Sequence, residues 1–284
     1  MAASESMRVG RSGAATVVFN AVGILFTVVM AFPAYWMINT AFKPANEVLT
    51  FTPQFFPAHP TWANFSSALG APNFLTDLKN SLIVTSCAVA GGLVVGFLGA
   101  LAIARFRFYG RRALVLAILI VQMVPFLALL IPLFLTLNRF QLTNTLTGVT
   151  VTYLILVLPY TVWMLRGFIV NVPRELDEAA LIDGCSRWQV FYRIILPLTG
   201  PGLVAASVYG FIQTWNEFVI INTLNGDASK QNLMAWLASN QTLRETHWGP
   251  LMAGATLTSL PVVIFFMLIQ RHVAAGLTAG AVKG

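Results

Sequence analysis

The hydrophobic positions of this chain form long blocks, and most of the charged positions lie between those blocks. Six stretches are long and apolar enough to cross a bilayer, which takes about 20 residues at a helical rise of about 1.5 Å per residue. They span residues 17–42, 80–104, 112–137, 146–171, 196–221 and 251–271. Strands of a membrane barrel would instead alternate apolar and polar positions. The pattern therefore predicts six transmembrane helices.

Composition supports a membrane protein. Hydrophobic residues make up 57% of the 284 positions and charged residues only 10%. The mean hydropathy is +0.75, well above the range of ordinary water-soluble domains. The fold class that we expect is an all-α integral membrane protein with a lipid bilayer as its principal solvent.

The net charge of +7 would also suit a nucleic-acid-binding protein, so the placement of the basic residues decides its meaning. With a cytoplasmic N-terminus, 12 of the 17 Lys and Arg residues fall on the cytoplasmic side. These are Arg8, Arg11, Arg105, Arg107, Arg111, Arg112, Arg166, Arg174, Arg187, Arg193, Arg271 and Lys283. The bias predicts cytoplasmic termini at both ends and no nucleic-acid partner.

The same pattern sets the expected domain boundaries. Residues 1–16 form an N-terminal tail, 17–271 the six-helix domain, and 272–284 a C-terminal tail. The first apolar stretch is too long for a signal-peptide core and should be retained. Spans two and three are joined by few residues and should form an antiparallel hairpin. Small residues in span two, namely Gly91, Gly92, Gly96, Gly99 and Ala100, should let another helix pack closely.

Between spans four and five, residues 172–197 predict two short helices. Pro173 suits a first helical position, and acidic residues follow it at the positive end of the helix dipole. Gly184 can adopt the left-handed conformation that ends a helix. Ser186 followed by Gln189 predicts a capping box at the start of the second helix. Such a helix at a membrane surface suits docking into a soluble partner.

Residues of this loop resemble a known family. The pattern Glu178-Ala179-Ala180, then Gly184, then Ile195-Leu196-Pro197, is similar to the EAA loop of permease subunits in bacterial ABC importers of the binding-protein-dependent family. In that family the loop is a cytoplasmic coupling helix that docks on the ATPase subunit. The resemblance implies polar contacts from Glu178 and Asp183, close packing at Ala179 and Ala180, and a turn at Gly184.

The resemblance covers nearly the whole chain, with the family's permease core over about 75–271, and it points to the carbohydrate-uptake branch and its MalG-like subunits. Further segments that look like this branch are YWMINTAFK, Asn80-Ser81-Leu82, MVP, IPLF, TWNEF and GLTAGAVKG. The family implies a second permease, an ATPase dimer that binds ATP and Mg, and an extracytoplasmic binding protein that delivers a carbohydrate. It also implies a bacterial inner-membrane location and a second ATPase contact at the C-terminus, around Gly276, Lys283 and Gly284.

The embedded acid Glu217 is the other candidate site. A charge near the bilayer centre costs about 2.5 to 3.5 kcal/mol on insertion scales, so it needs a reason. Glu217 either faces a solute path, where Trp215 would stack on a sugar and Asn216 would bond to hydroxyls, or it holds helices together. Gln122, Asn138 and Tyr153 are weaker candidates of the same kind. The loop near 222–250 would meet the binding protein.

Other function classes are less well supported by the sequence. The chain has no G-x-x-x-x-G-K-[ST] nucleotide loop, so we expect no catalysis and no cofactor in this chain. His59, His247 and His272 lack a metal-ligand spacing. Cys87 and Cys185 lie at different membrane depths, which excludes a disulfide between them. An ion-coupled secondary transporter of a small polar solute remains the alternative, with Glu217 as its thin support.

Overall fold

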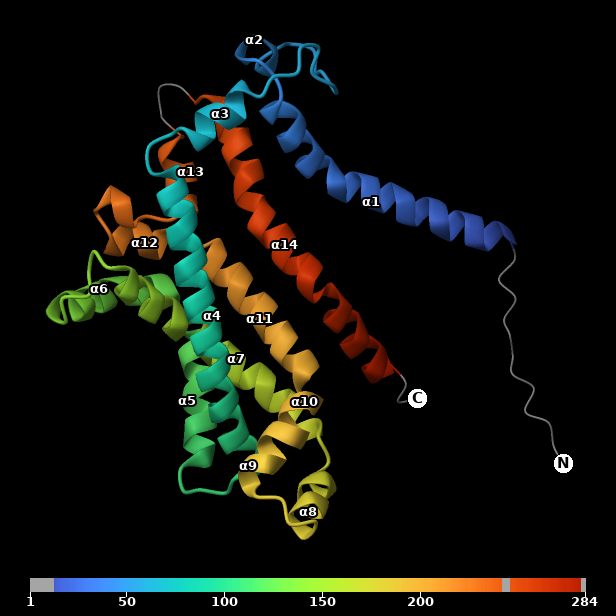
Figure 1. Ribbon diagram of the computed structural model, residues 1–284, viewed down its shortest axis with the longest axis vertical. Helices are drawn as coiled ribbons and strands as arrows, with labels where there is room; N and C mark the ends of the chain where they lie inside the picture. Colours follow the sequence, from blue (N-terminus) through green and yellow to red (C-terminus); the bar gives the residue numbers. More distant parts are fainter. Residues whose placement is uncertain (1–12, 242–245, 282–284) are drawn as a thin grey trace. The chain divides into compact units, whose positions relative to one another are not determined.

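The computed structural model describes residues 13–241 and 246–281, and these residues form helices and connecting segments without any strand (Figure 1). The chain divides into two compact units. The first contains Met1–Ala68 and Glu245–Thr256, and the second contains Leu69–Arg244 and Leu257–Gly284. The all-helical prediction is confirmed for the described residues.

The first unit contains the first apolar helix and a folded segment that follows it. Helix α1 spans Gly13–Ala41, α2 spans Ala45–Val48 and α3 spans Ala63–Leu69. Apolar side chains of α1, such as Val18 and Leu25, are exposed along its length, as expected of a helix that meets lipid. The amide of Asn64 donates to the carbonyls of Ala41 and Lys43 at 2.9 and 2.7 Å, which fixes α3 against the end of α1.

Glu47 organises the segment between α2 and α3. Its carboxylate accepts the Ala58 amide at 3.0 Å and lies 2.7 Å from Nδ1 of His59. The hydrogen bond with His59, assisted by the Ala58 amide, holds the pKa of Glu47 below its ordinary value. Because the folded pKa is lowered, this stabilisation is present above the ordinary pKa of about 4.3 and is lost as the pH falls through the folded value.

We therefore expect amide protection around Ala58 to fall in acid, below about pH 4. Glu47→Gln should weaken protection at neutral pH and remove its dependence on pH. Hydrogen exchange measured as protection factors over 49–62 tests this, with residues 146–171 as the internal reference. Unchanged protection of Ala58 in the variant would show that Glu47 does not hold this segment.

Three long helices form the core of the second unit. Helix α4 spans Phe74–Arg105, α7 spans Leu146–Asn171 and α11 spans Gly200–Trp215, and they pack against one another (Figure 1). A Cβ atom added at Gly91 would lie 2.7 Å from Leu154 Cδ1, and one at Gly96 would lie 2.7 Å from Thr161 Cγ2. The predicted close approach at the glycines of span two is confirmed, and the helix that approaches is α7.

Gly96→Val should destabilise the α4–α7 contact by about 1–3 kcal/mol, because the buried Thr161 leaves no room for larger atoms. The midpoint of thermal unfolding in mild detergent measures the effect. Gly23→Val is the matched control, since a Cβ at Gly23 meets nothing within 4 Å. Equal midpoints for the two variants would contradict the packing argument.

Two of the six predicted spans are not continuous helices. The stretch 112–137 contains α5 (Arg111–Met123), the 3-10 helix η1 (Phe126–Leu129) and α6 (Leu130–Arg139), with a bend of 96° between its halves. Pro125 has no amide hydrogen to donate, and Val124 before it takes an extended conformation with ψ 123°. The span was predicted as one transmembrane helix, and the structure divides it into two helices at Pro125. The expected hairpin would require α5 to pack mainly against α4. Helix α5 instead packs mainly against α7.

The stretch 196–221 is not one continuous helix either. The chain bends by 68° between Arg187–Leu198 and α11, and it leaves the helix after Trp215. Helix α12, Val219–Leu224, follows as a separate element. Among the described residues, four helices are long and apolar enough to span a membrane, or up to six if each bent pair counts as one span.

Three further elements lie in the C-terminal part of the chain. They are the 3-10 helix η3 (Ala228–Lys230), α13 (Leu233–Ser239) and α14 (Trp248–Ala281). Helix α14 begins near the predicted start of the sixth span and continues beyond residue 271, where the C-terminal tail was expected to begin. Both cysteines are free thiols, as the sequence predicted.

Candidate functional site

Residues 172–197 fold into the two short helices that the sequence predicted. Helix α8 spans Arg174–Ile182, with Pro173 as its N-cap, one position earlier than expected. Helix α9 spans Arg187–Val190 and starts with a complete capping box. The Ser186 amide donates to Gln189 Oε1 at 2.6 Å, and the Gln189 amide donates to Ser186 Oγ at 3.3 Å. The five-residue π-helix η2 (Phe191–Ile195) and α10 (Leu196–Leu198) lead into α11.

Gly184 ends α8 in the way that was predicted. Its φ is +87°, the left-handed conformation that glycine adopts at little cost. The Gly184 amide donates to the Leu181 carbonyl at 3.1 Å, and the Cys185 amide donates to the Ala180 carbonyl at 2.9 Å. These two bonds form a Schellman motif, which satisfies carbonyls at the end of the helix and fixes where the chain leaves it.

One face of the loop packs into the core of the second unit. Ala180 is 7% exposed, Val190 5% and Ile195 4%. They join a cluster of buried residues that includes Ile103 of α4 and Leu165 of α7. The loop is therefore attached to α4 and α7 by apolar contacts from Ala180 of α8, Val190 of α9 and Ile195 of η2.

An ion pair between α4 and α8 adds a polar attachment. Arg105 Nε lies 2.9 Å from Asp177 Oδ2, and the two side chains are only 8% and 17% exposed. The Nε–H group of Arg105 does not point toward this oxygen, so the contact is an ion pair without a hydrogen bond. Burial raises the pKa of the Asp177 carboxyl, while Arg105 and Arg174 lower it. Burial is the larger effect, so the pKa lies above its ordinary value, and Arg105 favours the charged carboxylate.

Two further hydrogen bonds hold the same junction. Arg105 Nη2 donates to the Val172 carbonyl at 2.9 Å, and Arg174 Nη2 donates to the Ala104 carbonyl at 3.1 Å. In one bond the last turn of α4 donates to the residues just before α8, and in the other the start of α8 donates to α4. Sequence reasoning missed this junction, because Arg105 was counted only as a topology signal and its partners lie far along the chain.

The opposite face of α8 is open. Residues spaced three and four apart lie on one side of a helix, and Glu175, Glu178, Ala179 and Ile182 have this spacing. All four are exposed, and Ile182 is 86% exposed. Asp183 beyond the helix end is exposed as well. An exposed isoleucine flanked by two acids and an alanine is a small apolar contact surface with acidic edges, which we call the outer face of α8.

The predicted loop residues thus separate into two groups. Glu178, Ala179 and Asp183 are exposed, whereas Ala180 and Ile195 are buried in the chain's own core. Leu196 is half-buried and Pro197 is exposed. Ala180 therefore lies on the buried face of α8, where it packs into the core, and not on the outer face.

The second candidate group lies where α11 gives way to α12. Trp215 is 2% exposed and stacks on Phe211, with ring centroids 5.4 Å apart, so its ring is enclosed by the chain itself. Asn216 is exposed and its amide donates to the Ile212 carbonyl at 2.9 Å. Glu217 lies between the helices, and its carboxylate accepts the Ile220 amide at 3.0 and 2.9 Å, which caps α12.

Glu217 also joins a polar network that the sequence showed only in part. Tyr153 of α7 donates its hydroxyl to Glu217 Oε2 at 3.2 Å, and Asn232 donates to the Glu217 backbone carbonyl at 2.8 Å. Nearby, Asn80 donates to the carbonyls of Ser229 and Gln231 at 3.0 and 2.9 Å. These contacts favour the second alternative, in which Glu217 holds elements together.

The C-terminal candidates are only partly described. Gly276 lies within the helical range of α14, while Lys283 and Gly284 fall outside the described residues. In the part of the chain that the structure describes, no group of three or more His, Cys, Asp or Glu residues is arranged to hold a metal ion.

Fold and site together define an all-helical protein with several membrane-length helices and a rigid short helix that presents an open face at the far end of the second unit from α12 and α13 (Figure 1). A family model described as the inner membrane component of binding-protein-dependent transport systems matches residues 92–279. The chain belongs to this family, and it is a multi-pass transport permease.

Individual relatives agree with the family over more than nine-tenths of the chain. The chain is 42% identical over 265 residues to the diacetylchitobiose uptake system permease protein DasC of Streptomyces coelicolor, covering 93% of this chain and 96% of that protein. It is 31% identical over 268 residues to the trehalose transport system permease protein SugB of Mycobacterium tuberculosis, covering 92% and 96%.

A solved structure supports the fold. A chain of a bacterial ABC transporter involved in the import of the acidic polysaccharide alginate superposes with a TM-score of 0.78, at 20% identity, covering 92% of this chain and 98% of that one.

Proposed function

We propose that this chain is the transmembrane permease subunit of an ATP-binding-cassette importer. With a second permease it forms the pathway for a sugar or oligosaccharide that an extracytoplasmic binding protein delivers. The observation that carries the proposal is the outer face of α8, an exposed surface on a helix whose other face is fixed in the core at Ala180 and Asp177. Such a helix can transmit a partner's motion to α4 and α7 without deforming.

In this proposal the partner on the outer face is an ATPase subunit. Glu178 and Asp183 supply polar contacts, while Ala179 and the exposed Ile182 supply close apolar packing. ATP and Mg are bound by the ATPase dimer, and this chain contributes no catalytic group. The region around Gly276, Lys283 and Gly284 is a second contact with the ATPase dimer.

The carbohydrate class rests on the named relatives. DasC and SugB are named for diacetylchitobiose and trehalose transport, and the alginate importer has also been solved with a periplasmic protein that holds an alginate pentasaccharide. These substrates share many hydroxyl groups and differ in size and charge. We therefore assign a sugar or oligosaccharide to this chain and no single compound.

The proposed membrane arrangement has six spans with cytoplasmic termini at both ends. Each bent pair, α5 with α6 and the 187–198 segment with α11, counts as one broken span. The coupling loop then lies on the cytoplasmic side with most of the basic residues, as the positive-inside rule requires. Residues 1–16 and 272–284 flank the membrane domain on that side.

Purification of the tagged full-length chain from its native membrane in mild detergent tests the proposal, with mass spectrometry of the proteins that accompany it. The expected result is a complex with one further permease and an ATPase subunit. Recovery of the chain alone or as a homo-oligomer, from a preparation that is monodisperse and folded, would overturn the proposal and favour an ion-coupled secondary transporter.

A further inference from the structure

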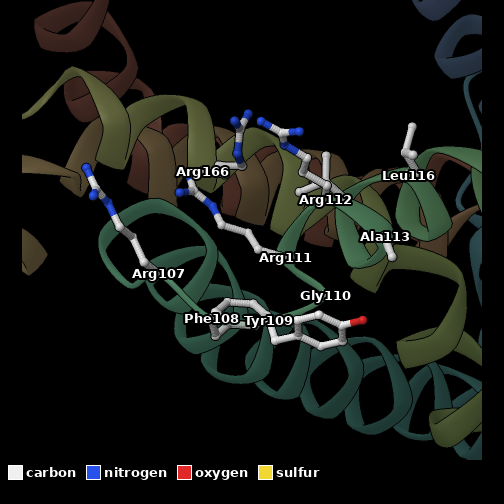
Figure 2. A pocket seen from close by; sticks show the side chains of 10 residues that line it. Arg107, Phe108, Tyr109, Gly110, Arg111, Arg112, Ala113, Leu116 and Arg166 are labelled. Carbon is white, nitrogen blue, oxygen red and sulfur yellow. The ribbon is translucent and has the colours of Figure 1, made fainter.

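Four arginines line one hollow at the end of the second unit that carries the α4–α5 loop. The hollow has a volume of about 920 Å³, and its basic lining residues are Arg107, Arg111, Arg112 and Arg166. Figure 2 shows the side chains of Arg111 and Arg112, from the start of α5, and Arg166, from α7, directed toward the same region. The sequence placed these residues on one side of the membrane but did not indicate that they converge.

No acidic residue lines the hollow. None of the four arginines takes part in an ion pair within the described part of the chain. Arg166 lies over the Trp163 ring at 5.3 Å, and its Nε is buried without a hydrogen-bond partner. Guanidinium groups around one hollow repel one another, and a buried donor left without an acceptor costs about 1–3 kcal/mol. The hollow therefore presents positive charge that a bound anion would neutralise.

The surroundings indicate that the anion is carried by a lipid. The hollow lies where α4, a helix of membrane-spanning length, ends and α5 begins. Phe108 is 41% exposed and Tyr109 is fully exposed beside the arginines. Apolar side chains of α5, among them Leu116 at 58% and Ile120 at 60%, are exposed along the helix that leaves the hollow. A charged headgroup site next to exposed aromatic and aliphatic side chains is typical of a lipid-binding surface at a membrane boundary.

We infer that this hollow binds the phosphate headgroup of an anionic phospholipid, with Arg111, Arg112 and Arg166 around the phosphate and the acyl chains along α5. Arginine suits this role because its planar guanidinium pairs with two phosphate oxygens at once. The site is separate from the outer face of α8, so it does not depend on the transport proposal.

Native mass spectrometry of the full-length chain, in whatever complex it purifies, tests the inference. The protein is reconstituted with graded phosphatidylglycerol in phosphatidylcholine, and the lipids that remain bound are counted. The wild type should retain phosphatidylglycerol in preference to phosphatidylcholine. Replacement of Arg111, Arg112 and Arg166 by Gln should weaken phosphatidylglycerol binding about fivefold per arginine, and about 100-fold together. Arg139→Gln, an exposed basic residue at the end of α6, is the matched control and should stay within about twofold of wild type.

Three results would overturn the inference. The first is equal phosphatidylglycerol retention by the triple variant and the wild type, and the second is an equal loss in Arg139→Gln. The third is displacement of the lipid by millimolar inorganic phosphate, which would assign the hollow to a soluble anion. If the triple variant does not fold, the inference is tested by a measurement on the wild type alone. Phosphatidylglycerol should raise its thermal midpoint more than phosphatidylcholine does, and an equal rise would also reject the lipid site.

Discussion

Glu178→Lys is expected to abolish solute uptake while the chain still inserts in the membrane. Glu178 is exposed on the outer face of α8 and takes part in no ion pair within the described part of the chain. Reversing its charge would place a cation in the acid-edged surface proposed to bind the ATPase. Disrupting a buried charged contact at an interface costs about 2–5 kcal/mol, enough to lower complex formation roughly 30-fold or more. Uptake of labelled sugar and the amount of co-purified ATPase measure the effect.

Two comparisons make this experiment specific. Asp227→Lys applies the same charge reversal in the exposed segment before η3, at the opposite end of the second unit, and it should leave ATPase co-purification unchanged (Figure 1). Glu178→Gln keeps the size of the side chain and should give an intermediate loss. Normal uptake by Glu178→Lys would count decisively against the role of α8 in coupling.

Local signals in the sequence predicted the fold of residues 172–197 in detail. The capping box at Ser186 and Gln189 and the left-handed Gly184 depend on residues within one or two turns, and both are present in the structure. The helix Leu146–Asn171 also matches its predicted range, because a long apolar run has few alternatives in a bilayer. These features were predictable because the residues that determine them lie close together along the chain.

The bends were harder to predict, because proline alone does not decide them. Pro159 and Pro261 lie inside the continuous helices α7 and α14, whereas Pro125 lies at the 96° bend before η1. The difference is that Val124 adopts an extended conformation before Pro125. Neighbouring helices and side chains determine whether the backbone groups freed by a proline are satisfied within the helix or outside it. A single sequence does not contain that information.

Long-range polar partners were the other features that the sequence could not supply. Glu217 was recognised as an acid that needs a partner, yet its capping of α12 depends on the chain leaving the helix after Trp215. Asn232, which bonds to the Glu217 backbone, lies in a segment predicted only as a loop. Arg105 and Asp177 each had a simpler local explanation, one as a topology charge and the other as a helix-dipole charge.

The ion pair between Arg105 and Asp177 leads to the second large expected effect, in Asp177→Asn. This change leaves Arg105, whose side chain is 8% exposed, without its counter-charge, and breaking a buried pair costs about 3–5 kcal/mol. Helix α8 has nine residues, and isolated helices shorter than about 12 residues are marginal, so its order depends on its attachment. We expect uptake to fall at least roughly tenfold and amide exchange of α8 to rise markedly.

A charge swap separates this attachment from simple damage to the fold. Asp177→Arg combined with Arg105→Asp should recover part of the uptake that either change removes alone, because the pair is restored while the bond from Arg105 to Val172 is not. Arg174→Gln is the matched control, since it removes one hydrogen bond to Ala104, worth about 1 kcal/mol, and leaves the ion pair intact. If the double variant were no better than the singles, the two charges would act independently. Motion of the outer face would then reach α4 through the apolar contacts of Ala180 and the hydrogen bond from Arg174 to Ala104.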